Sequence, residues 1–283
     1  TAMIPSILPS TGPIGVFDSG YGGLTILDKI RGLMPEYDYI YLGDSARCPY
    51  GPRSFEVVYE FTLQAVSKLF ELGCPLVILA CNTASAKALR TIQQINLPVI
   101  DATRRVLGVI RPTAECIGEI TRSRHVGILA TAGTIKSESY LLEIHKLSPD
   151  IVVTGEACPM WVSLVENNEY QSEGADYFVK QHINRLLDKD PMIDTIILGC
   201  THYPLLLDKI RQFTPGHIRI IAQGEYVARS LQDYLNRHPE MDARCEKGGK
   251  CRFLTTESEN KFEESASIFL GRQDIKVKSI ALE

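Results

Sequence analysis

Two cysteines in this sequence stand where a fold can use them for chemistry, because each directly follows a short apolar run. Cys200 comes after the run Thr195–Leu198 and one glycine, and His202 lies two residues further on. Cys81 comes directly after the run Leu76–Ala80 and precedes hydrogen-bonding side chains. Short, β-branched apolar runs are typical of buried strands, and open α/β sheets bind ligands beyond the carboxyl ends of their strands. We therefore expect both thiols at a binding cleft.

Two thiols that face one another across a cleft suit the racemisation of an α-amino acid. One base must remove the Cα proton, and an acid on the opposite face must return one. A thiolate and a thiol do this in either direction by exchanging roles, and cationic neighbours make the thiolate accessible at neutral pH. Two alternatives stay open. Cys200 with His202 is also the pair that a thiol hydrolase or lyase needs, and a two-lobed protein can bind an amino acid without catalysis.

Two further stretches place polar residues directly after predicted strands. Asp18 and Ser19 follow the strand Pro13–Phe17 and precede a glycine-rich turn into a helix. Such a turn lets a ligand approach the backbone and the N–H groups of the helix start, although either residue could simply be a helix N-cap. The loop Gly43–Pro52 is polar, with two glycines and two prolines, and is either a connector or a ligand clamp.

Strands and helices are predicted to alternate along the whole chain. The predicted strands are 13–17, 39–42, 76–80, 99–100, 125–130, 151–153, 195–198, 218–221, 251–256 and 275–277. The predicted helices are 25–33, 54–72, 84–95, 104–120, 137–147, 161–166, 174–187, 205–213, 224–235 and 259–270. This alternation is typical of parallel sheets with helices on both faces.

The chain also contains a weak internal repeat at the scale of a domain. Val126 matches Ile14 (126 − 14 = 112), and Cys200 matches Cys81 at a similar offset (200 − 81 = 119). We therefore predict an α/β fold of two pseudo-symmetric, doubly wound domains, each a mostly parallel sheet flanked by helices, with the active site in the cleft between them. The first domain is predicted to comprise residues 1–108 plus 216–283, and the second 109–215.

Handedness then predicts which turns share an edge. Right-handed crossovers put the turns at 18, 50 and 81 on one edge of the first sheet. The turns at 131, 158 and 200 are expected at the matching edge of the second.

Composition and charge argue against several classes of protein. The 283 residues are 45% hydrophobic and 23% charged, as in soluble globular proteins. The net charge of −4 argues against nucleic-acid partners and anionic membrane surfaces. No apolar run is long enough for a membrane span, and Thr1–Pro13 shows no secretory signal. Eight cysteines without framework spacing predict free thiols and a cytoplasmic location. Lacking a dinucleotide loop, a Walker motif or a metal-ligand cluster, the sequence predicts no cofactor and no metal.

The chain resembles the glutamate racemases, members of the cofactor-independent aspartate/glutamate racemase family. The resemblance runs from Ile14 to about Leu270 and rests on motifs that occur in order: Phe17–Gly23, Gly43–Asp44 with Pro49–Gly51, Cys81–Ala84 and Gly199–Pro204. It implies an isomerase that interconverts L- and D-glutamate and supplies D-glutamate for peptidoglycan, and hence for cell wall biogenesis and cell shape. A racemase of another acidic amino acid, such as aspartate, is the alternative.

The resemblance also implies roles for individual residues. Cys81 and Cys200 would be the two acid/base residues, with Asp18 and His202 beside them and Glu166 near the second thiol. The implied substrate-binding residues are Asp18, Ser19, Tyr50, Gly51, Asn82, Thr83, Thr134, Thr201 and His202. The resemblance further implies a homodimer and, in some members, activation by a cell-wall precursor.

Overall fold

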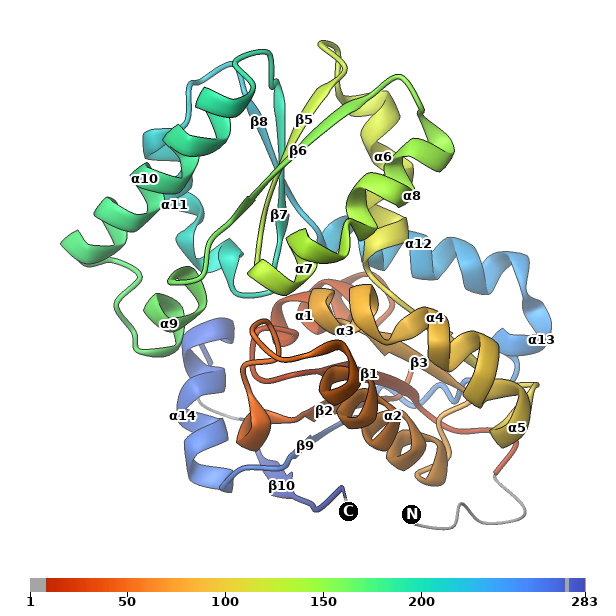
Figure 1. Cartoon of the computed structure of the whole chain (residues 1–283). Helices are drawn as coiled ribbons and strands as arrows, with labels where there is room; N and C mark the ends of the chain where they lie inside the picture. The colour runs from red at the N-terminus through yellow and green to blue at the C-terminus, as the bar shows by residue number, and fades with distance from the viewer. Residues whose placement is uncertain (1–8, 273–274, 283) are drawn as a thin grey trace.

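The computed structural model describes residues 9–272 and 275–282, so the first eight residues of the stretch Thr1–Pro13 lie outside the described residues. Two sheets stand one above the other in Figure 1, and within each sheet the neighbouring strands pair in parallel. The first sheet comprises β1 (Ile14–Asp18), β2 (Tyr39–Gly43), β3 (Leu76–Leu79), β4 (Arg105–Leu107), β9 (Cys251–Thr255) and β10 (Val277–Ser279). The second comprises β5 (His125–Ala130), β6 (Val152–Ala157), β7 (Thr195–Gly199) and β8 (Arg219–Ala222).

Strand order confirms the internal repeat. The first sheet runs β10-β9-β2-β1-β3-β4 and the second runs β6-β5-β7-β8. The order β2-β1-β3-β4 is therefore repeated as β6-β5-β7-β8, and β3 and β7, which lead to the two cysteines, occupy equivalent places. The predicted fold of two pseudo-symmetric α/β units is confirmed, with β9 and β10 as an addition to the first.

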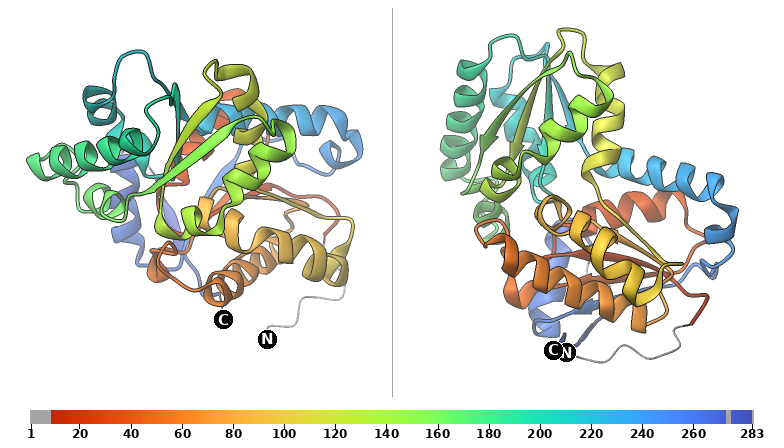
Figure 2. Two further views of the ribbon diagram at one scale, coloured as in Figure 1. Left: turned by 45° about the horizontal axis from the view of Figure 1, so that its top comes forward. Right: turned by 45° about the vertical axis from the view of Figure 1, so that its right-hand side comes forward.

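Helices cover both faces of each sheet (Figures 1 and 2). They are α1 (Leu24–Leu33), α2 (Phe55–Glu71), α3 (Asn82–Lys87), α4 (Leu89–Thr91), α5 (Leu97–Asp101), α6 (Ile110–Ile120), α7 (Ala132–Ser137), α8 (Ser139–Leu147), α9 (Trp161–Glu166), α10 (Glu173–Lys189), α11 (Leu207–Phe213), α12 (Gly224–Arg237), α13 (Pro239–Asp242) and α14 (Glu259–Leu270). Single turns of 3₁₀ helix lie at Ser45–Arg47 and Tyr203–Leu206, and a π-helical turn lies at Ile92–Asn96. Among the described helices, none combines the length and the apolar character that crossing a membrane requires.

The central strand β1 is buried on both faces. Ile14 and Val16 point into one apolar cluster, which includes residues of α1, α12 and α14, whereas Phe17 points into a second cluster with α2 and α3. A parallel strand covered on both sides is a nearly continuous apolar run, so its sequence does not alternate between apolar and polar residues. The polar residues that follow such a strand are held by a rigid framework.

The predictions around residue 100 were wrong. The predicted strand at 99–100 is part of α5, where Pro98 occupies the first turn, a position that favours helix. Val99 is 86% exposed, so this apolar pair is not a buried strand. The predicted helix 104–120 begins only at Ile110, because Arg105–Leu107 pairs with β3 as the edge strand β4.

The point at which the chain returns from the second unit to the first also differs from the predicted one. β8 pairs with β7, so residues 219–222 belong to the second sheet, although the predicted boundary assigned everything from 216 onward to the first domain. The repeat explains this, since β8 is the counterpart of β4. The chain returns to the first unit after Ala222, where α12 packs beside α1 (Figure 2). The rest of the predicted division into domains stays a prediction.

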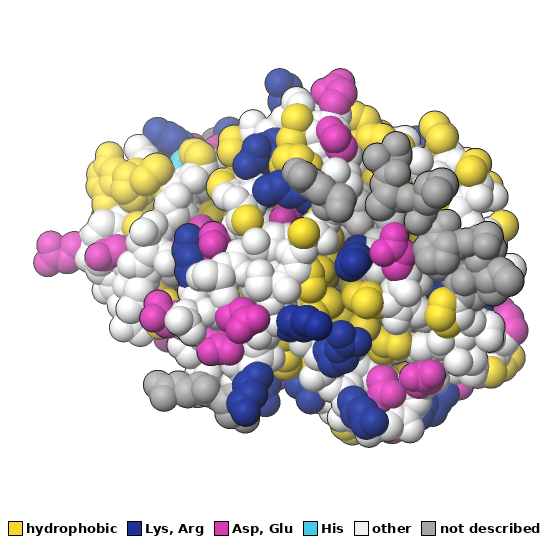
Figure 3. Space-filling view, turned by 90° about the horizontal axis from the view of Figure 1, so that it is seen from below, with side chains coloured by type: hydrophobic (Ala, Val, Ile, Leu, Met, Phe, Trp, Pro, Cys, Tyr) yellow, Lys and Arg dark blue, Asp and Glu magenta, His cyan; other side chains and the backbone are white. Residues whose placement is uncertain are grey.

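Charges of both signs are spread over the surface. On the face of the first unit drawn in Figure 3, Lys and Arg side chains alternate with Asp and Glu side chains around small apolar areas. Neither sign covers this face, in keeping with the net charge of −4.

Candidate active site

A small cavity of about 30 Å³ lies where the two units meet. Its walls are formed by residues that directly follow β1, β3, β5 and β7, by the loop after β2 and by one residue of α9. The lining residues are Asp18, Ser19, Cys48, Pro49, Tyr50, Gly51, Cys81, Asn82, Thr83, Thr131, Val162, Cys200, Thr201 and His202. The structure thus brings both predicted thiols, one from each repeat, into the same cavity.

Cys81 occupies the N-cap position of α3. Its Sγ accepts a hydrogen bond from the backbone N–H of Ala84 at 3.4 Å, which places the sulfur at the start of the helix. Burial and the nearby charge of Asp18 raise the pKa of the Cys81 thiol to about 12, although the Ala84 N–H and the Ser19 hydroxyl oppose this shift. Cys81 is therefore a thiol at neutral pH.

Asp18 is the last residue of β1 and lies near this thiol. Its Oδ2 accepts hydrogen bonds from the N–H groups of Gly20 at 3.2 Å and Gly23 at 2.9 Å. Oδ1 is buried and has no hydrogen-bond partner among the described residues. Burial raises the pKa of Asp18, and the charge of His202 and the backbone N–H groups only partly offset the effect. A Cβ at position 23 would lie 2.5 Å from the Cβ of Asp18, so the turn requires glycine there.

Cys200 has a different neighbourhood. His202 Nδ1 lies 3.9 Å from its Sγ, and His202 Nε2 is 2.9 Å from Oε1 of Glu166 at the end of α9. Burial lowers the pKa of His202, but the contacts with Cys200 and Glu166 outweigh it and raise this pKa to about 10. His202 is therefore an imidazolium at neutral pH, and a cation at this distance stabilises negative charge on the Cys200 sulfur.

Hydroxyl groups complete the wall of the cavity. Ser19, Thr83 and Thr201, three of the substrate-binding residues that the resemblance implies, all line it. The two units approach very closely beside Thr201, because a Cβ at Gly22 would lie 2.2 Å from its Oγ1. Only glycine at position 22 allows this approach, which gives the glycine-rich turn after Asp18 a structural reason.

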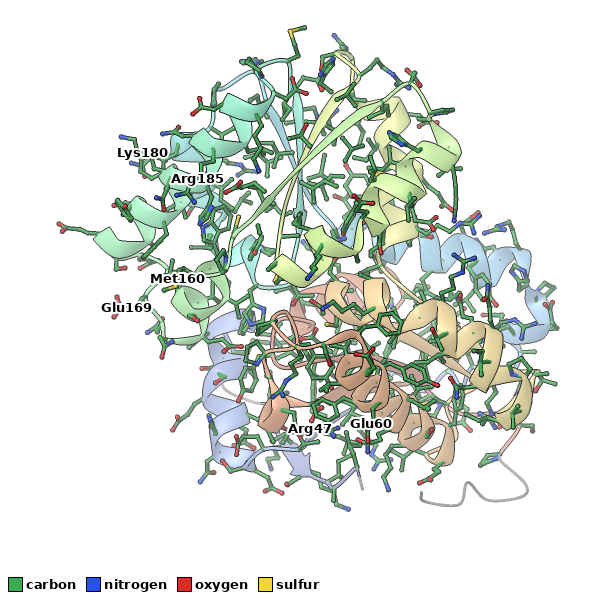
Figure 4. The ribbon with its side chains drawn as sticks, viewed as in Figure 1. Arg47, Glu60, Met160, Glu169, Lys180 and Arg185 are labelled. Atoms are coloured by element: carbon green, nitrogen blue, oxygen red, sulfur yellow. The ribbon has the colours of Figure 1, made fainter. Side chains whose placement is uncertain are left out.

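The loop after β2 supplies Tyr50 and Gly51, both in the lining. Tyr50 points its hydroxyl away from the cavity, donating a hydrogen bond to Oδ2 of Asp44. Arg47, labelled in Figure 4 beside α2, also binds Asp44, with 2.8 Å between Nε and Oδ2, and lies over the ring of Phe61. These contacts hold the loop as a rigid wall and leave the Tyr50 ring as its contribution to the cavity.

Comparisons with known proteins agree with this geometry. The model of the Asp/Glu/Hydantoin racemase family matches residues 25–231. A protein of Bacillus cereus named glutamate racemase is 40% identical over 271 residues, which is 95% of this chain and 97% of the relative. The chain belongs to the Asp/Glu/Hydantoin racemase family. It is therefore a racemase, an isomerase.

Solved structures of glutamate racemases superpose on nearly the whole chain. Glutamate racemase isoform RacE1 from Bacillus anthracis gives a TM-score of 0.87 at 36% identity, over 96% of this chain and 98% of that one. The enzyme from Francisella tularensis, in complex with D-glutamate, gives 0.83 at 31%, over 97% and 99%. The Escherichia coli enzyme, in complex with L-glutamate and the activator UDP-MurNAc-ala, gives 0.73 at 27%, over 94% and 97%.

One cavity residue of the racemase, Thr131, was missed by sequence reasoning, which chose Thr134 instead. Thr131 lines the cavity, and its Oγ1 is 3.2 Å from the Oγ1 of Thr83 on the opposite unit. Thr134 is buried behind it and donates its backbone N–H to Thr131 Oγ1. The internal repeat could have identified Thr131, because the offset of 112 residues maps Thr131 onto Ser19 (131 − 112 = 19).

The cavity contains a third thiol, Cys48. Its Sγ lies 3.4 Å from Oε1 of Glu166, the oxygen that also binds His202. Burial and the charge of Glu166 raise the pKa of Cys48, so it is a thiol that donates to the carboxylate. Burial raises the pKa of Glu166, but the hydrogen bond and charge of His202 outweigh it and lower that pKa below its usual value. Glu166 is therefore an anion that links the two units.

Within the described residues, no three His, Cys, Asp or Glu side chains are arranged to hold a metal ion.

Proposed function

We propose that this racemase interconverts L- and D-glutamate by proton transfer between Cα and two cysteines. The observation that carries the proposal is the pair of thiols, Cys81 and Cys200, which follow equivalent strands of the repeat and line one cavity. Glutamate is the substrate named for the relatives that cover the whole chain. The substrate's Cα would lie between the two sulfurs.

The two thiols differ in the charge of their neighbours. We propose that Cys200, beside the His202 imidazolium, acts first as the base, and that Cys81, beside Asp18, acts as the acid. The Cys200 thiolate removes the Cα proton from one face, and its sulfur becomes a thiol. The Cys81 thiol then delivers its proton to the other face and becomes a thiolate. One proton leaves the carbon and one arrives, and the reverse reaction exchanges the roles.

Charge that develops on the substrate carboxylate during proton removal needs hydrogen-bond donors. The hydroxyl groups of Ser19, Thr83 and Thr201 line the cavity and could supply them. Removing one donor from a preorganised oxyanion site costs on the order of 10²–10³ in rate. We assign these three side chains to the α-carboxylate and the ammonium group, and the Tyr50–Gly51 wall to the side chain of the substrate.

Substrate entry requires a movement of the two units. A cavity of about 30 Å³ holds no more than one or two water molecules, which is less space than a glutamate molecule occupies. We therefore propose that the units separate to admit the substrate and close for the reaction. Closure excludes water and strengthens every electrostatic contact in the site.

A thiol hydrolase is less consistent with the site. The Cys200–His202 pair alone does not separate the two reactions, because a thiolate beside a cationic histidine is also the nucleophile of thiol hydrolases. The second thiol does separate them, because a hydrolase would leave Cys81 in the cavity without a role. Detection of a thioester between Cys200 and a substrate would reverse this preference.

Three further expectations remain proposals. We propose that the D-glutamate produced supplies peptidoglycan, that the chain forms a homodimer, and that a cell-wall precursor regulates it. The activator UDP-MurNAc-ala, bound by the Escherichia coli relative, supports the last of these.

The decisive experiment is incorporation of solvent deuterium. Purified protein is incubated with L-glutamate in D₂O without any added cofactor, and Cα deuteration and optical rotation are followed together. We expect D-glutamate labelled at Cα. Binding of glutamate with neither exchange nor inversion would contradict the proposal, and faster turnover of aspartate than of glutamate would assign the alternative substrate.

A further inference from the structure

Behind the cavity, four buried polar side chains form a cluster that joins the two units. They are Asn82 at the start of α3, Thr113 on α6, Tyr140 on α8 and Gln223 directly before α12. Thr113 lies where the chain first enters the second unit, after β4. Gln223 lies where it returns to the first unit, after β8. Figure 1 shows α3, α6, α8 and the start of α12 meeting at this junction.

Gln223 is the centre of this cluster. Its side-chain amide forms a reciprocal pair with Asn82, in which Asn82 Nδ2 donates to Gln223 Oε1 at 2.8 Å and Gln223 Nε2 donates to Asn82 Oδ1 at 3.1 Å. Nε2 also lies 3.0 Å from Thr113 Oγ1 and within hydrogen-bond reach of the Tyr140 hydroxyl. Thr113 donates its own hydroxyl proton to the carbonyl of Val109, so toward Gln223 it is an acceptor.

These contacts fix the orientation of the Asn82 amide. Its Oδ1 accepts from both Gln223 and the Tyr140 hydroxyl, so the oxygen is held inside the cluster. One Nδ2 hydrogen is used by Gln223, and the second remains for the cavity that Asn82 lines. Asn82 therefore offers a donor, and no acceptor, to a bound molecule. It directly follows Cys81, so the same contacts hold the turn that carries the thiol.

We propose that Gln223 is a positioning residue of the reaction. It directs the Asn82 amide N–H into the cavity and ties the Cys81 turn to the second unit at the point where both chain crossings meet. This inference rests on the proposed function, because it takes glutamate as the molecule that Asn82 meets and Cys81 as one of the acid/base residues. Buried polar clusters of this kind are costly when one member loses its partner, so a single substitution at position 223 is informative.

The test compares Gln223→Glu with Gln223→Met. A carboxylate at position 223 has the shape of the amide but cannot donate to Asn82 Oδ1, so the two oxygens repel one another and the orientation of the Asn82 amide is no longer fixed. We expect kcat/KM for glutamate to fall on the order of 10- to 100-fold. Lowering the pH should partly restore the Gln223→Glu variant relative to wild type, because a protonated carboxyl group donates again. The Gln223→Met variant should show the loss without this recovery.

A matched control separates positioning from simple destabilisation. Thr121 lies at the end of α6, where its hydroxyl donates to Asp194 Oδ1 at 2.6 Å, away from the cavity. Thr121→Val should lower the melting temperature and leave kcat, KM and their pH dependence unchanged.

Two outcomes would overturn the inference. One is wild-type kinetics in both Gln223 variants, and the other is the same pH profile for Gln223→Glu and Gln223→Met. If wild-type protein neither exchanges nor inverts glutamate, the proposed function fails, and with it the basis of the inference.

Discussion

The Cys81 turn and the Cys200 turn hold equivalent places in the repeat but differ in their surroundings. Cys81 caps a helix and lies near the buried carboxylate of Asp18. Cys200 leads into a 3₁₀ turn and lies beside the His202 imidazolium, which Glu166 holds from α9. The proposed reaction is symmetric, whereas the two halves of its site differ in the charge beside each thiol.

This difference shows what the repeat determines and what it leaves to local residues. Strand order places each thiol at the same edge, because β3 and β7 are equivalent. The charged groups beside each thiol come instead from residues that the repeat does not share, namely Asp18 on one side and His202 with Glu166 on the other. In the proposed reaction one sulfur takes the Cα proton while the other delivers its own, so the pair needs one base and one acid in either direction.

The largest expected effect tests the two thiols separately. Cys81→Ala and Cys200→Ala should each lower racemisation by about 10⁴-fold, the upper range for loss of a general acid or base. Their residual activities should differ. Without Cys81, the Cys200 thiolate can still remove and return a proton on one face, so one enantiomer exchanges with D₂O without inversion. Without Cys200, the remaining Cys81 thiol, with a pKa of about 12, already holds its proton at neutral pH and cannot take one from Cα, so neither enantiomer exchanges.

The same variants test which of the two cysteines acts as the base. Proton NMR of each enantiomer in D₂O measures the exchange directly, and circular dichroism of the folded variants serves as the structural control. Exchange by Cys200→Ala and none by Cys81→Ala would reverse the assignment of the resting thiolate.

A smaller effect is expected at the cation. His202→Asn should lower kcat about 10²-fold, within the range for a charge that stabilises a reacting group. The pKa of His202 is raised from its unfolded value of 6.5 to about 10. The imidazolium is therefore present through neutral pH and is lost as the pH rises through about 10. We expect wild-type kcat to fall across that range and the variant to lack this limb.

The pH dependence of stability has the same sign. Because the folded pKa of His202 is the higher one, its contribution is complete below about 6.5 and disappears as the pH rises through about 10. Thermal unfolding of wild type and His202→Asn between pH 6 and 11 checks this. A constant difference in melting temperature over the whole range would show that His202 is neutral in the fold.

Most of this architecture could be predicted from the sequence, and the errors share a physical cause. Strong apolar runs such as Leu76–Ala80 gave the central strands, and the residues after them gave the thiols. β4 was missed because Arg105–Leu107 is a short edge strand that depends on pairing with β3. Such pairing is tertiary, and local composition does not reveal it.

The site residues that were missed depend on tertiary contacts in the same way. Gln223 reads as a solvent-exposed residue at a helix start, and only the meeting of the two chain crossings buries it. Cys48 reads as an isolated thiol, and its role depends on the position of α9 in the other unit. Thr131 differs from both, because the repeat offset would have found it.

Weaker effects are expected where Cys48 and Glu166 join the two units. Glu166→Gln removes the anion that stabilises the imidazolium, so kcat should fall about 10-fold and the alkaline limb should move to lower pH. Cys48→Ala removes one weak donor to Glu166 and should cost about 2- to 5-fold. Cys251→Ala on β9 is the matched control and should leave the pH profile unchanged. An unaltered alkaline limb in Glu166→Gln would mean that Glu166 does not set the charge of His202.

The smallest expected effect is a gain in stability when Asp18, the acidic neighbour of Cys81, loses its charge. Asp18 is buried and its Oδ1 has no hydrogen-bond partner among the described residues, so its charge is unfavourable in the fold and its pKa is raised. Asp18→Asn keeps an oxygen for the N–H groups of Gly20 and Gly23 and removes the charge. We expect the free energy of unfolding at pH 7 to rise by about 1 kcal/mol, with a loss of activity, as is common for stabilised active sites.

The pH dependence of this gain separates charge from packing. Because the folded pKa of Asp18 is the higher one, wild type loses stability as the pH rises from the unfolded value of 3.8 through the folded value. The advantage of Asp18→Asn should therefore vanish below about pH 4 and grow toward neutral pH, measured by urea unfolding. Asp188→Asn, on the exposed side of α10, should change stability by less than about 0.5 kcal/mol at any pH. A lower free energy of unfolding for Asp18→Asn would mean that the attraction between Asp18 and His202 outweighs the cost of burying the Asp18 charge. The charges beside the two thiols would then stabilise one another.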